Sequence, residues 1–381
     1  MSRKKNVMIV AGEASGDIYG ANLVLAMKEL SPDIAFSGIG GPGMERAGVN
    51  ILYHASDMAV VGITEIMPKI GYILHALSRL KSILKNTPPD LLIIIDYPGF
   101  NLNLAKKARS LGIPVLYYIP PQVWAWRKRR VIKISKRTDR IAVILPFEKD
   151  FYREYIDNVD YVGHPLLDIS LPEKSNEEIR ESLGIDHKRE PIIGLLPGSR
   201  TEEIARHLPI MIEAAEIISR DFPDLYCILP LASTMKEPFV LPYLKNTAVD
   251  IAIGKSDTKE LLKISDLALI ASGTATLEAA VMETPMIITY KTSLMTYLLA
   301  RMLVKVSHIG LVNLVAGKTI VPELIQGEAT AVGLSEEALA ILRNQELKAD
   351  MKKELQLVKS SLGHGGASQR TAAIAWEMMG R

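Results

Sequence analysis

Several features that identify common classes of protein are missing from these 381 residues. A single cysteine, Cys227, excludes an internal disulfide and any metal site built from several thiolates. No apolar run approaches the roughly 20 residues of a membrane-spanning helix, and the N-terminus runs straight into a predicted strand, unlike a signal peptide. The formal net charge is only +2, so no overall field attracts nucleic acid. We therefore expect a cytoplasmic protein that does not bind nucleic acid.

Motifs for several kinds of ligand are missing as well. The glycine loop after the first predicted strand lacks the G-x-G-x-x-G spacing, which disfavours a nicotinamide dehydrogenase. The chain has no histidine pair at metal-ligand spacing. It also has no Asp-x-Asp triplet, the usual sugar-nucleotide motif that works through a divalent metal. We expect a site with no metal and no cofactor.

The residues that are present predict an α/β protein with two domains. Apolar residues make up 48% of the chain and charged residues 23%, and the length suits two domains of ordinary size. Short apolar runs alternate with segments of helical period, which is typical of Rossmann-like domains with parallel sheets. We place an N-terminal domain at residues 1–165 and a C-terminal domain at 166–362. A last helix at 363–381 packs on the N-terminal domain or on a partner chain.

A loop with two glycines follows the first predicted strand, residues 6–11. It carries Glu13, Ser15 and Asp17, and its glycines suit the close approach of a polar ligand. A tight turn with a helix cap explains the same residues equally well, so both interpretations stay open here.

The strand predicted at residues 91–95 ends in Asp96, which is followed by a Pro-Gly turn and Asn101. Ligands of open α/β sheets bind at the carboxyl ends of the strands, so a carboxylate there is well placed to accept a proton. The alternative is an aspartate that only caps the following helix. We take Asp96 as the candidate general base.

Residues 57–86 form a dense apolar stretch in which Pro68 separates two halves, the second with helical period. Most such stretches are core helices. The alternative is an insertion with an exposed apolar groove for acyl chains or a membrane surface.

A proline-flanked loop and a basic segment follow the strand predicted at residues 115–119. Trp124 lies in that loop, where a large aromatic side chain usually packs on something. The segment 127–140 is rich in lysine and arginine and includes Arg127, Arg129 and Arg130. It predicts either an ordinary solvated helix face or a surface for anionic lipid.

In the second half, the strand predicted at residues 192–196 leads into a loop that suits a diphosphate. Gly198 permits close approach, Ser199 can donate a hydrogen bond, and Arg200 supplies a forked cation. A capped turn with a surface arginine is the alternative.

A second anion loop follows the strand predicted at residues 267–271. Ser272, Gly273 and Thr274 form a turn of small residues before a helix, and Glu278 lies about one helical turn further on. The alternative is a βα turn with ordinary helix caps. Because both loops follow parallel strands, we expect them at the same edge of one sheet.

Taken together, six motifs in this order resemble the lipid-A-disaccharide synthase family of GT-B glycosyltransferases. The motifs are VAGEASGD (10–17), IDYPGFN (95–101), PQVWAWR (121–127), LPFEK (145–149), LLPGSR (195–200) and SGTATLE (272–278). Residues 312–314 and 321–326 match two further family segments. The chain departs from the family at Val312, where proline is frequent, and at Pro120, where serine is common.

The resemblance implies two Rossmann-like domains whose parallel sheets face each other across a cleft. It implies transfer of a sugar from UDP-2,3-diacylglucosamine to 2,3-diacylglucosamine 1-phosphate, giving the β-1,6-linked disaccharide 1-phosphate and UDP. The transfer inverts the anomeric carbon without a metal. The family also implies peripheral attachment to the inner face of the inner membrane of a Gram-negative bacterium.

The candidate residues then take roles. Asp96 is the first candidate for the base and Glu13 the second. The UDP-sugar would contact Gly198, Ser199, Arg200, Ser272, Gly273, Thr274, Glu278 and Asn313. The acceptor and its lipid would contact Ser15, Asp17, Asn101, Trp124, Arg127, Arg129 and Arg130.

Other functions share the donor-side pattern. A UDP-N-acetylglucosamine 2-epimerase needs no acyl site, and a non-catalytic sugar-nucleotide sensor at the membrane needs no base. A glycosyltransferase that makes the peptidoglycan lipid precursor should carry a Gly-Gly-His loop in place of residues 12–16. The sequence leaves open whether the protein is a monomer or a homodimer.

Overall fold

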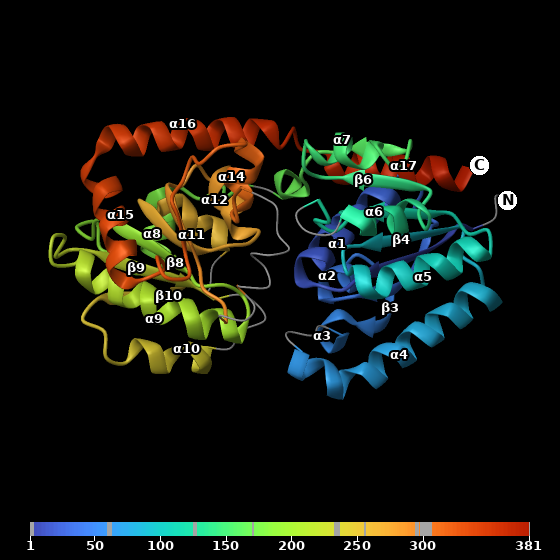
Figure 1. Ribbon diagram of the computed structural model, residues 1–381, viewed down its shortest axis with the longest axis horizontal. Helices are drawn as coiled ribbons and strands as arrows, with labels where there is room; N and C mark the ends of the chain where they lie inside the picture. Colours follow the sequence, from blue (N-terminus) through green and yellow to red (C-terminus); the bar gives the residue numbers. More distant parts are fainter. Residues whose placement is uncertain are drawn as a thin grey trace. The chain divides into compact units, whose positions relative to one another are not determined.

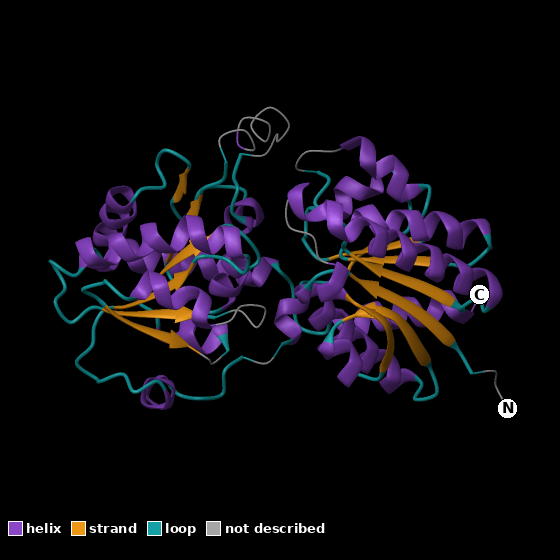
Figure 2. Cartoon of the chain, turned by 90° about the horizontal axis from the view of Figure 1, so that it is seen from below, coloured by secondary structure: helices purple, strands orange, loops and turns teal. Residues whose placement is uncertain are grey.

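The computed structural model describes residues 4–58, 63–124, 128–169, 171–231, 237–254, 257–293, 297 and 307–380. The chain divides into two compact units, one formed by Met1–Asp168 with Leu362–Arg381 and the other by Ile169–Ser361. Each unit contains one parallel sheet with helices on both faces (Figures 1 and 2). The predicted α/β class with parallel sheets is confirmed.

The sheet of the first unit has seven strands in the order β3-β2-β1-β4-β5-β6-β7. Their bounds are β1 Asn6–Ala11, β2 Ala35–Gly40, β3 Val49–His54, β4 Leu91–Ile95, β5 Val115–Tyr118, β6 Arg140–Val143 and β7 Val159–Tyr161. Strand β4 reads LLIII and is buried at every residue. A strand covered by helices on both faces needs such a continuous apolar run.

Nine helical segments belong to the described part of the first unit. They are α1 Ala14–Leu30, α2 Pro42–Arg46, α3 Ala55–Met58, α4 Ile63–Asn86, α5 Pro98–Ser110, α6 Lys128–Ser135, α7 Glu148–Arg153, the 3-10 turn Pro165–Asp168 and α17 Ala367–Gly380.

Helix α17, red in Figure 1, returns the end of the chain to the first unit and packs along α1. Asp168 holds its start, because the carboxylate accepts from the N–H groups of Gly366, Ala367 and Ser368 at 2.7, 2.9 and 2.7 Å. An acidic residue at a helix N-terminus satisfies otherwise unpaired N–H groups and complements the helix dipole. The last helix therefore packs on its own chain.

The sheet of the second unit has six strands in the order β10-β9-β8-β11-β12-β13. They are β8 Ile192–Leu196, β9 Tyr226–Pro230, β10 Asp250–Gly254, β11 Leu267–Ala271, β12 Met286–Tyr290 and β13 Glu323–Ile325. The helices described here are α8 Asn176–Ser182, α9 Thr201–Ile218, α10 Glu237–Leu244, α11 Thr258–Ile264, α12 Ala275–Val281, α14 Leu311–Ala316, α15 Ala331–Arg343 and α16 Gln345–Ser361.

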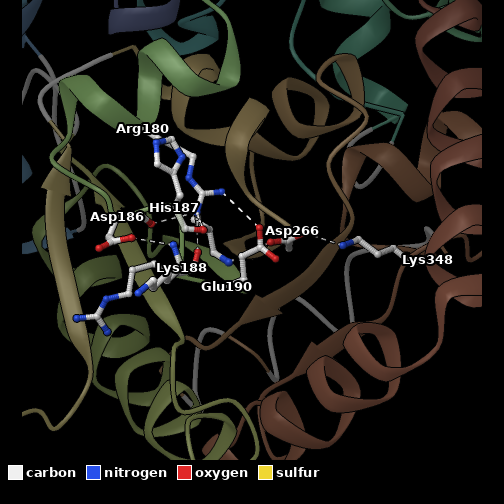
Figure 3. A network of polar contacts seen from close by, with 9 residues as sticks. Arg180, Asp186, His187, Lys188, Glu190, Asp266 and Lys348 are labelled. Carbon is white, nitrogen blue, oxygen red and sulfur yellow. Dashed lines mark hydrogen bonds and ion pairs between the residues drawn. The ribbon is translucent and has the colours of Figure 1, made fainter.

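A polar network fixes the amino ends of β8 and β11 (Figure 3). The guanidinium of Arg180 donates to three backbone carbonyls of the turn at residues 186–189, at 3.3, 3.3 and 2.8 Å. Asp266 accepts from Ile192 N at 3.0 Å and pairs with Lys348 Nζ at 2.8 Å. The network thus anchors the amino ends of β8 and β11, whereas the loops that were expected to bind phosphate follow their carboxyl ends.

Several elements differ from the sequence expectation. Strands β3 and β7 were not predicted, because edge strands with mixed burial lack a continuous apolar run. Pro68 does not separate two helices, since α4 continues through it. Asn313 belongs to helix α14 and Glu323 to strand β13.

Helix α4 has one core face and one exposed face. Ala76, Leu80 and Leu84, spaced four residues apart, are fully buried in the core that α4 shares with α5. Three large apolar side chains nearer its start are between 39% and 56% exposed: Ile70, Tyr72 and Leu74. The core interpretation therefore holds for the second half of the helix, and an exposed apolar surface remains in the first. None of the helices in the described part of the chain combines the length and apolar character needed to cross a bilayer.

Candidate active site

The order of the first sheet reverses between β1 and β4, with β2 and β3 on one side and β5 to β7 on the other. Ligands of open α/β sheets bind outside the carboxyl ends of the strands at such a switch point. Ala11 at the end of β1 is paired in register with Ile95 at the end of β4. The fold therefore brings the Gly12–Glu13 loop beside Asp96, although more than eighty residues separate them in the sequence.

The backbone at Asp96 is strained and firmly held. Asp96 and Tyr97 both have φ of +44°, which is unusual for residues with side chains and costs on the order of 1–3 kcal/mol each. The Asp96 carbonyl accepts from Asn101 Nδ2 at 2.8 Å and from Tyr117 OH at 3.0 Å, and its N–H donates to Ile119 O at 3.2 Å. Strained backbone that several hydrogen bonds hold in place is found mostly at functional sites.

Asn101, which belongs to α5, is fully buried. Besides the Asp96 carbonyl it reaches Ile95 O at 3.0 Å and Val10 O at 3.5 Å, so one amide ties the ends of β1 and β4 together. Contact of Asn101 with the acceptor, which the sequence analysis expected, stays a prediction. Its contacts in the fold are those of a residue that positions Asp96.

Glu13 and Tyr97 come together at the same edge. A Cβ at Gly12 would overlap the Tyr97 ring, so the ring lies directly on this glycine. Burial, and after it the charge of Glu13, raises the pKa of the Tyr97 phenol. Glu13 is exposed at the N-terminus of α1, and Ser15 is half-buried in the first turn. Two acidic residues from two loops thus share the switch point.

Asp17 has a different surrounding. Its carboxylate is buried and accepts from the N–H groups of Gly41, Gly43 and Met44 at 2.7, 2.8 and 2.9 Å. These bonds cap α2 and fix the turn after β2. Contact with the acceptor, which the sequence analysis expected of Asp17, stays a prediction.

Helix α7 holds the loop that contains Trp124. Glu148 Oε1 accepts from Trp124 Nε1 at 3.0 Å, and Tyr152, one helical turn on, donates to Pro121 O at 2.9 Å. Glu148 also accepts from Leu145 N at 3.1 Å. Burial raises the pKa of Glu148 to about 7, while these hydrogen bonds oppose the shift. The sequence analysis quoted the LPFEK segment but missed Glu148, because an acidic residue followed by Lys149 and Asp150 gives no local sign of burial.

In the described part of the basic segment, Arg130 acts electrostatically on a residue behind Asp96. Arg130 is half-buried, and its charge acts on the buried phenol of Tyr117, whose pKa is raised first by burial and then by Asp96. On α6, Val131 and Ile134 are buried. Arg127 and the side-chain surroundings of Arg129 lie outside the described part of the structure.

In the second unit the sheet order reverses between β8 and β11. Leu195 is paired with Leu269 and Leu196 with Ile270, so the loops that follow the two strands start side by side. One carries Gly198 to Arg200 and the other Ser272 to Thr274. The expectation that both loops share one sheet edge is confirmed.

Two residues that the sequence analysis missed fix the first of these loops. Glu203 accepts from the N–H groups of Ser199 and Arg200. His207 is buried, with Nδ1 at 3.1 Å from Pro197 O and Nε2 accepting from Lys291 N at 2.9 Å. The N–H facing Nε2 requires the neutral ring with its proton on Nδ1, in keeping with burial that lowers the pKa of His207.

The second loop is tied to the start of α14. Ser272 Oγ donates to Ile309 O at 3.0 Å, and Glu323 accepts from Ile309 N at 2.8 Å and Gly310 N at 3.0 Å. Asn313 is fully buried and donates to Glu323 Oε1 at 2.8 Å. Its described hydrogen bonds are internal, so contact with the donor sugar stays a prediction.

The surroundings of Gly273 leave room for a ligand. A Cβ added at Gly273 would meet only Ala271 O, at 4.0 Å, and Thr274 is exposed. Glu278 is half-buried, and burial followed by the charge of Asp257 raises its pKa, while Lys259 lowers it. Within the described ranges, no group of three or more histidine, cysteine, aspartate or glutamate side chains is arranged to hold a metal ion.

Comparison with known proteins decides the family. The model of the family described as lipid-A-disaccharide synthetase matches residues 7–376. The chain belongs to the lipid-A-disaccharide synthetase family. The lipid-A-disaccharide synthases of Trichlorobacter lovleyi and Myxococcus xanthus are 46% and 40% identical to it over 379 residues, covering 100% of this chain and 99% of each relative. Membership of the family makes the chain an enzyme of the glycosyltransferase class, and the resemblance drawn from the motifs is confirmed.

Solved structures agree on the GT-B fold. The UDP-GlcNAc 2-epimerase of Neisseria meningitidis bound to UDP-GlcNAc has a TM-score of 0.68 at 15% identity, covering 98% of this chain and 100% of that one. The calicheamicin glycosyltransferase CalG4 has a TM-score of 0.62 at 12% identity, covering 100% and 99%. A fold shared at such identities carries no activity, so the epimerase alternative gains nothing from it.

Proposed function

We propose that the protein transfers the sugar of UDP-2,3-diacylglucosamine to the 6-hydroxyl of 2,3-diacylglucosamine 1-phosphate, with inversion and without a metal. Its family supports a sugar nucleotide and a lipid acceptor as the substrate classes. The observation that carries the site assignment is the position of the candidate loops. In each unit they follow the two strands at the switch point of the sheet.

The transfer forms one bond and breaks one. The acceptor 6-oxygen attacks the anomeric carbon, its proton passes to Asp96, and the electron pair of the broken C–O bond leaves on the β-phosphate of UDP. The rigid turn around Asp96 supports this role, because a base must be held in one orientation. Glu13 is the second candidate for the base and otherwise orients the acceptor together with Ser15.

On the donor side, charge develops on the phosphates as UDP leaves, and preorganised donors lower that barrier. We assign the diphosphate to Ser199, Arg200 and the Ser272 to Thr274 turn. Gly198, at φ +113°, lets the backbone come close. Glu278 accepts hydrogen bonds from the ribose hydroxyls.

We further propose that the protein binds the inner face of the inner membrane peripherally. The exposed apolar side chains of α4 and the exposed Ile132 and Lys133 of α6 support this location. Apolar side chains insert among acyl chains while basic ones pair with anionic headgroups.

The test is an assay with EDTA that follows disaccharide phosphate and UDP together. Asp96→Asn keeps the shape of the side chain and removes its basicity. We expect wild type to form both products and Asp96→Asn to lose at least a hundredfold in kcat. Asp33→Asn, an exposed turn residue of the same unit, is the matched control and should match wild type.

Three results would contradict the proposal. No disaccharide from folded wild type would remove the reaction and return attention to an epimerase or a sensor. Full activity in Asp96→Asn would remove Asp96 as the base and favour Glu13. A requirement for added Mg²⁺ would remove the metal-free mechanism.

A further inference from the structure

The groups assigned to the donor's diphosphate already bind an anion within the chain. Glu203 Oε2 accepts from Ser199 N at 3.1 Å and from Arg200 N at 3.3 Å. Glu203 Oε1 accepts from Arg200 Nη1 at 3.2 Å. Two backbone N–H groups and one guanidinium therefore converge on a single carboxylate at the start of α9.

A capping box accounts for only part of this arrangement. In a capping box the N-cap side chain accepts from the backbone N–H three residues later, and the acidic side chain of that later residue accepts from the N-cap N–H. Here the N-cap is Arg200, whose side chain has no acceptor. The box explains neither the guanidinium contact nor the fit of Gly198, where an added Cβ would lie 2.5 Å from Glu203 Oε2. The loop is shaped around the carboxylate.

A carboxylate and a phosphate compete for such donors. Both accept charge-assisted N–H bonds of similar length, and both are favoured at a helix N-terminus. An N–H that donates to Glu203 is not available in the same geometry to a phosphate oxygen. A diphosphate that uses Arg200 must therefore draw the guanidinium away from Glu203.

We propose that Glu203 is an internal counter-anion that competes with the donor's diphosphate for Arg200 and the Ser199 N–H, and so sets the affinity for the nucleotide. In the absence of ligand it holds the loop in an anion-binding shape. The choice of a nucleoside diphosphate as the competitor rests on the proposed function.

The exchange needs no opening of the core. The Arg200 side chain is 49% exposed and the Glu203 side chain 23%. Ion pairs of such exposure are weak, so the competitor is displaceable but not negligible. Removing its charge should tighten UDP binding roughly two- to fivefold.

The experiment compares Glu203→Gln with Glu202→Gln by calorimetric titration with UDP and with uridine. Glutamine keeps an acceptor for the loop N–H groups and removes the negative charge. Glu202 lies in the same helical turn and pairs with Arg206 at 3.5 Å, so its variant changes the net charge and the helix dipole equally. Uridine lacks phosphate, so a change in its affinity would reveal an effect on the nucleoside site that does not depend on the diphosphate.

We expect Glu203→Gln to bind UDP more tightly than wild type, with uridine affinity unchanged and Glu202→Gln equal to wild type. Equal or weaker UDP binding by Glu203→Gln would overturn the inference, as would the same gain in Glu202→Gln or for uridine. These outcomes leave the donor site itself standing. A wild type that binds no UDP would instead remove the proposed donor site, and the disaccharide assay tests the reaction independently.

Should Glu203→Gln fold poorly, Glu203→Asp provides a second comparison. The shorter side chain keeps the charge and the N–H contacts but reaches less far toward Arg200 Nη1. It should bind UDP between wild type and the expected Glu203→Gln value. Weaker binding than wild type in this variant would overturn the inference as well.

Discussion

Glu148 makes the stability of the first unit depend on pH in a direction opposite to most carboxylates. Its pKa of about 7 in the folded chain lies above the usual 4.3 of an exposed glutamate, because burial disfavours the charged form. Between these two values the folded state holds a proton that the unfolded state has lost. Stability therefore falls as the pH rises from about 4.5 to 7 and then levels. One pKa unit corresponds to about 1.4 kcal/mol, so the whole change amounts to about 4 kcal/mol.

Glu148→Gln removes this titration while keeping the size of the side chain and one acceptor for Trp124 Nε1. The variant loses a fixed amount at every pH, because one oxygen becomes a donor that faces Leu145 N. The difference in unfolding free energy between variant and wild type should nevertheless shift by about 2.5 kcal/mol in favour of the variant from pH 5 to pH 8. The prediction concerns how this free-energy difference changes with pH, and not its value at any one pH.

Urea unfolding followed by tryptophan fluorescence measures this difference, since all three tryptophans belong to the first unit. Glu154→Gln changes an exposed carboxylate just after the same helix and supplies the baseline. Parallel pH profiles for wild type and Glu148→Gln would refute the reasoning. They would mean that the Glu148 carboxyl titrates alike in the folded and unfolded chain.

Three further predictions concern the loops and the exposed surface. Asn101→Ala removes one hydrogen-bond donor from the carbonyls of Ile95 and Asp96, so we expect the unfolding free energy in urea to fall by about 2 kcal/mol and kcat to fall with little change in donor KM. An unchanged kcat would contradict its positioning role. Burial lowers the pKa of His207, so its ring stays neutral through neutral pH and is protonated only below the usual value of about 6.5. The protonated ring can no longer accept from Lys291 N, so UDP affinity should fall in that acidic range in wild type and stay constant with pH in His207→Ala. Titrations with UDP at several pH values measure this, and equal profiles for the two proteins would refute the argument. Leu74→Glu should reduce severalfold the fraction of protein that sediments with anionic vesicles. Leu357→Glu, at a similarly exposed leucine of α16, should not, and equal effects would contradict α4 as the membrane contact.

The loops of the candidate site could be found from the sequence because each signal is local. A buried parallel strand is a continuous apolar run, and its end is marked by glycine or a polar residue, as at Asp96 and Ser272. The rule that ligands bind at the carboxyl ends of such strands then selects the loops. Glu13, Asp96, Arg200 and the turn after β11 follow from these two steps.

The roles of several side chains could not be found in this way. Asp17, Asn101 and Asn313 are of residue types that often bind ligands. In the fold, the carboxylate of Asp17, the side-chain nitrogen of Asn101 and the amide of Asn313 instead form hydrogen bonds within the protein. The bond from Asn101 to Val10 O spans 91 residues. A polar side chain in a βα loop binds either a ligand or the protein itself, and the residue type is the same in both cases.

The sequence by itself thus determined the α/β class, the two parallel sheets, the family and the loops that carry the chemistry, because apolar runs, turn residues and motif order are properties of neighbouring residues. Only the tertiary structure decided which polar atoms are already satisfied: the carboxylate of Asp17 and the side-chain nitrogen of Asn101 in the first unit, and the ring of His207 in the second. It also decided which apolar residues of α4 stay exposed. Hydrogen-bond partners and burial depend on segments far apart in the chain, and the order of the strands in each sheet brings those segments together.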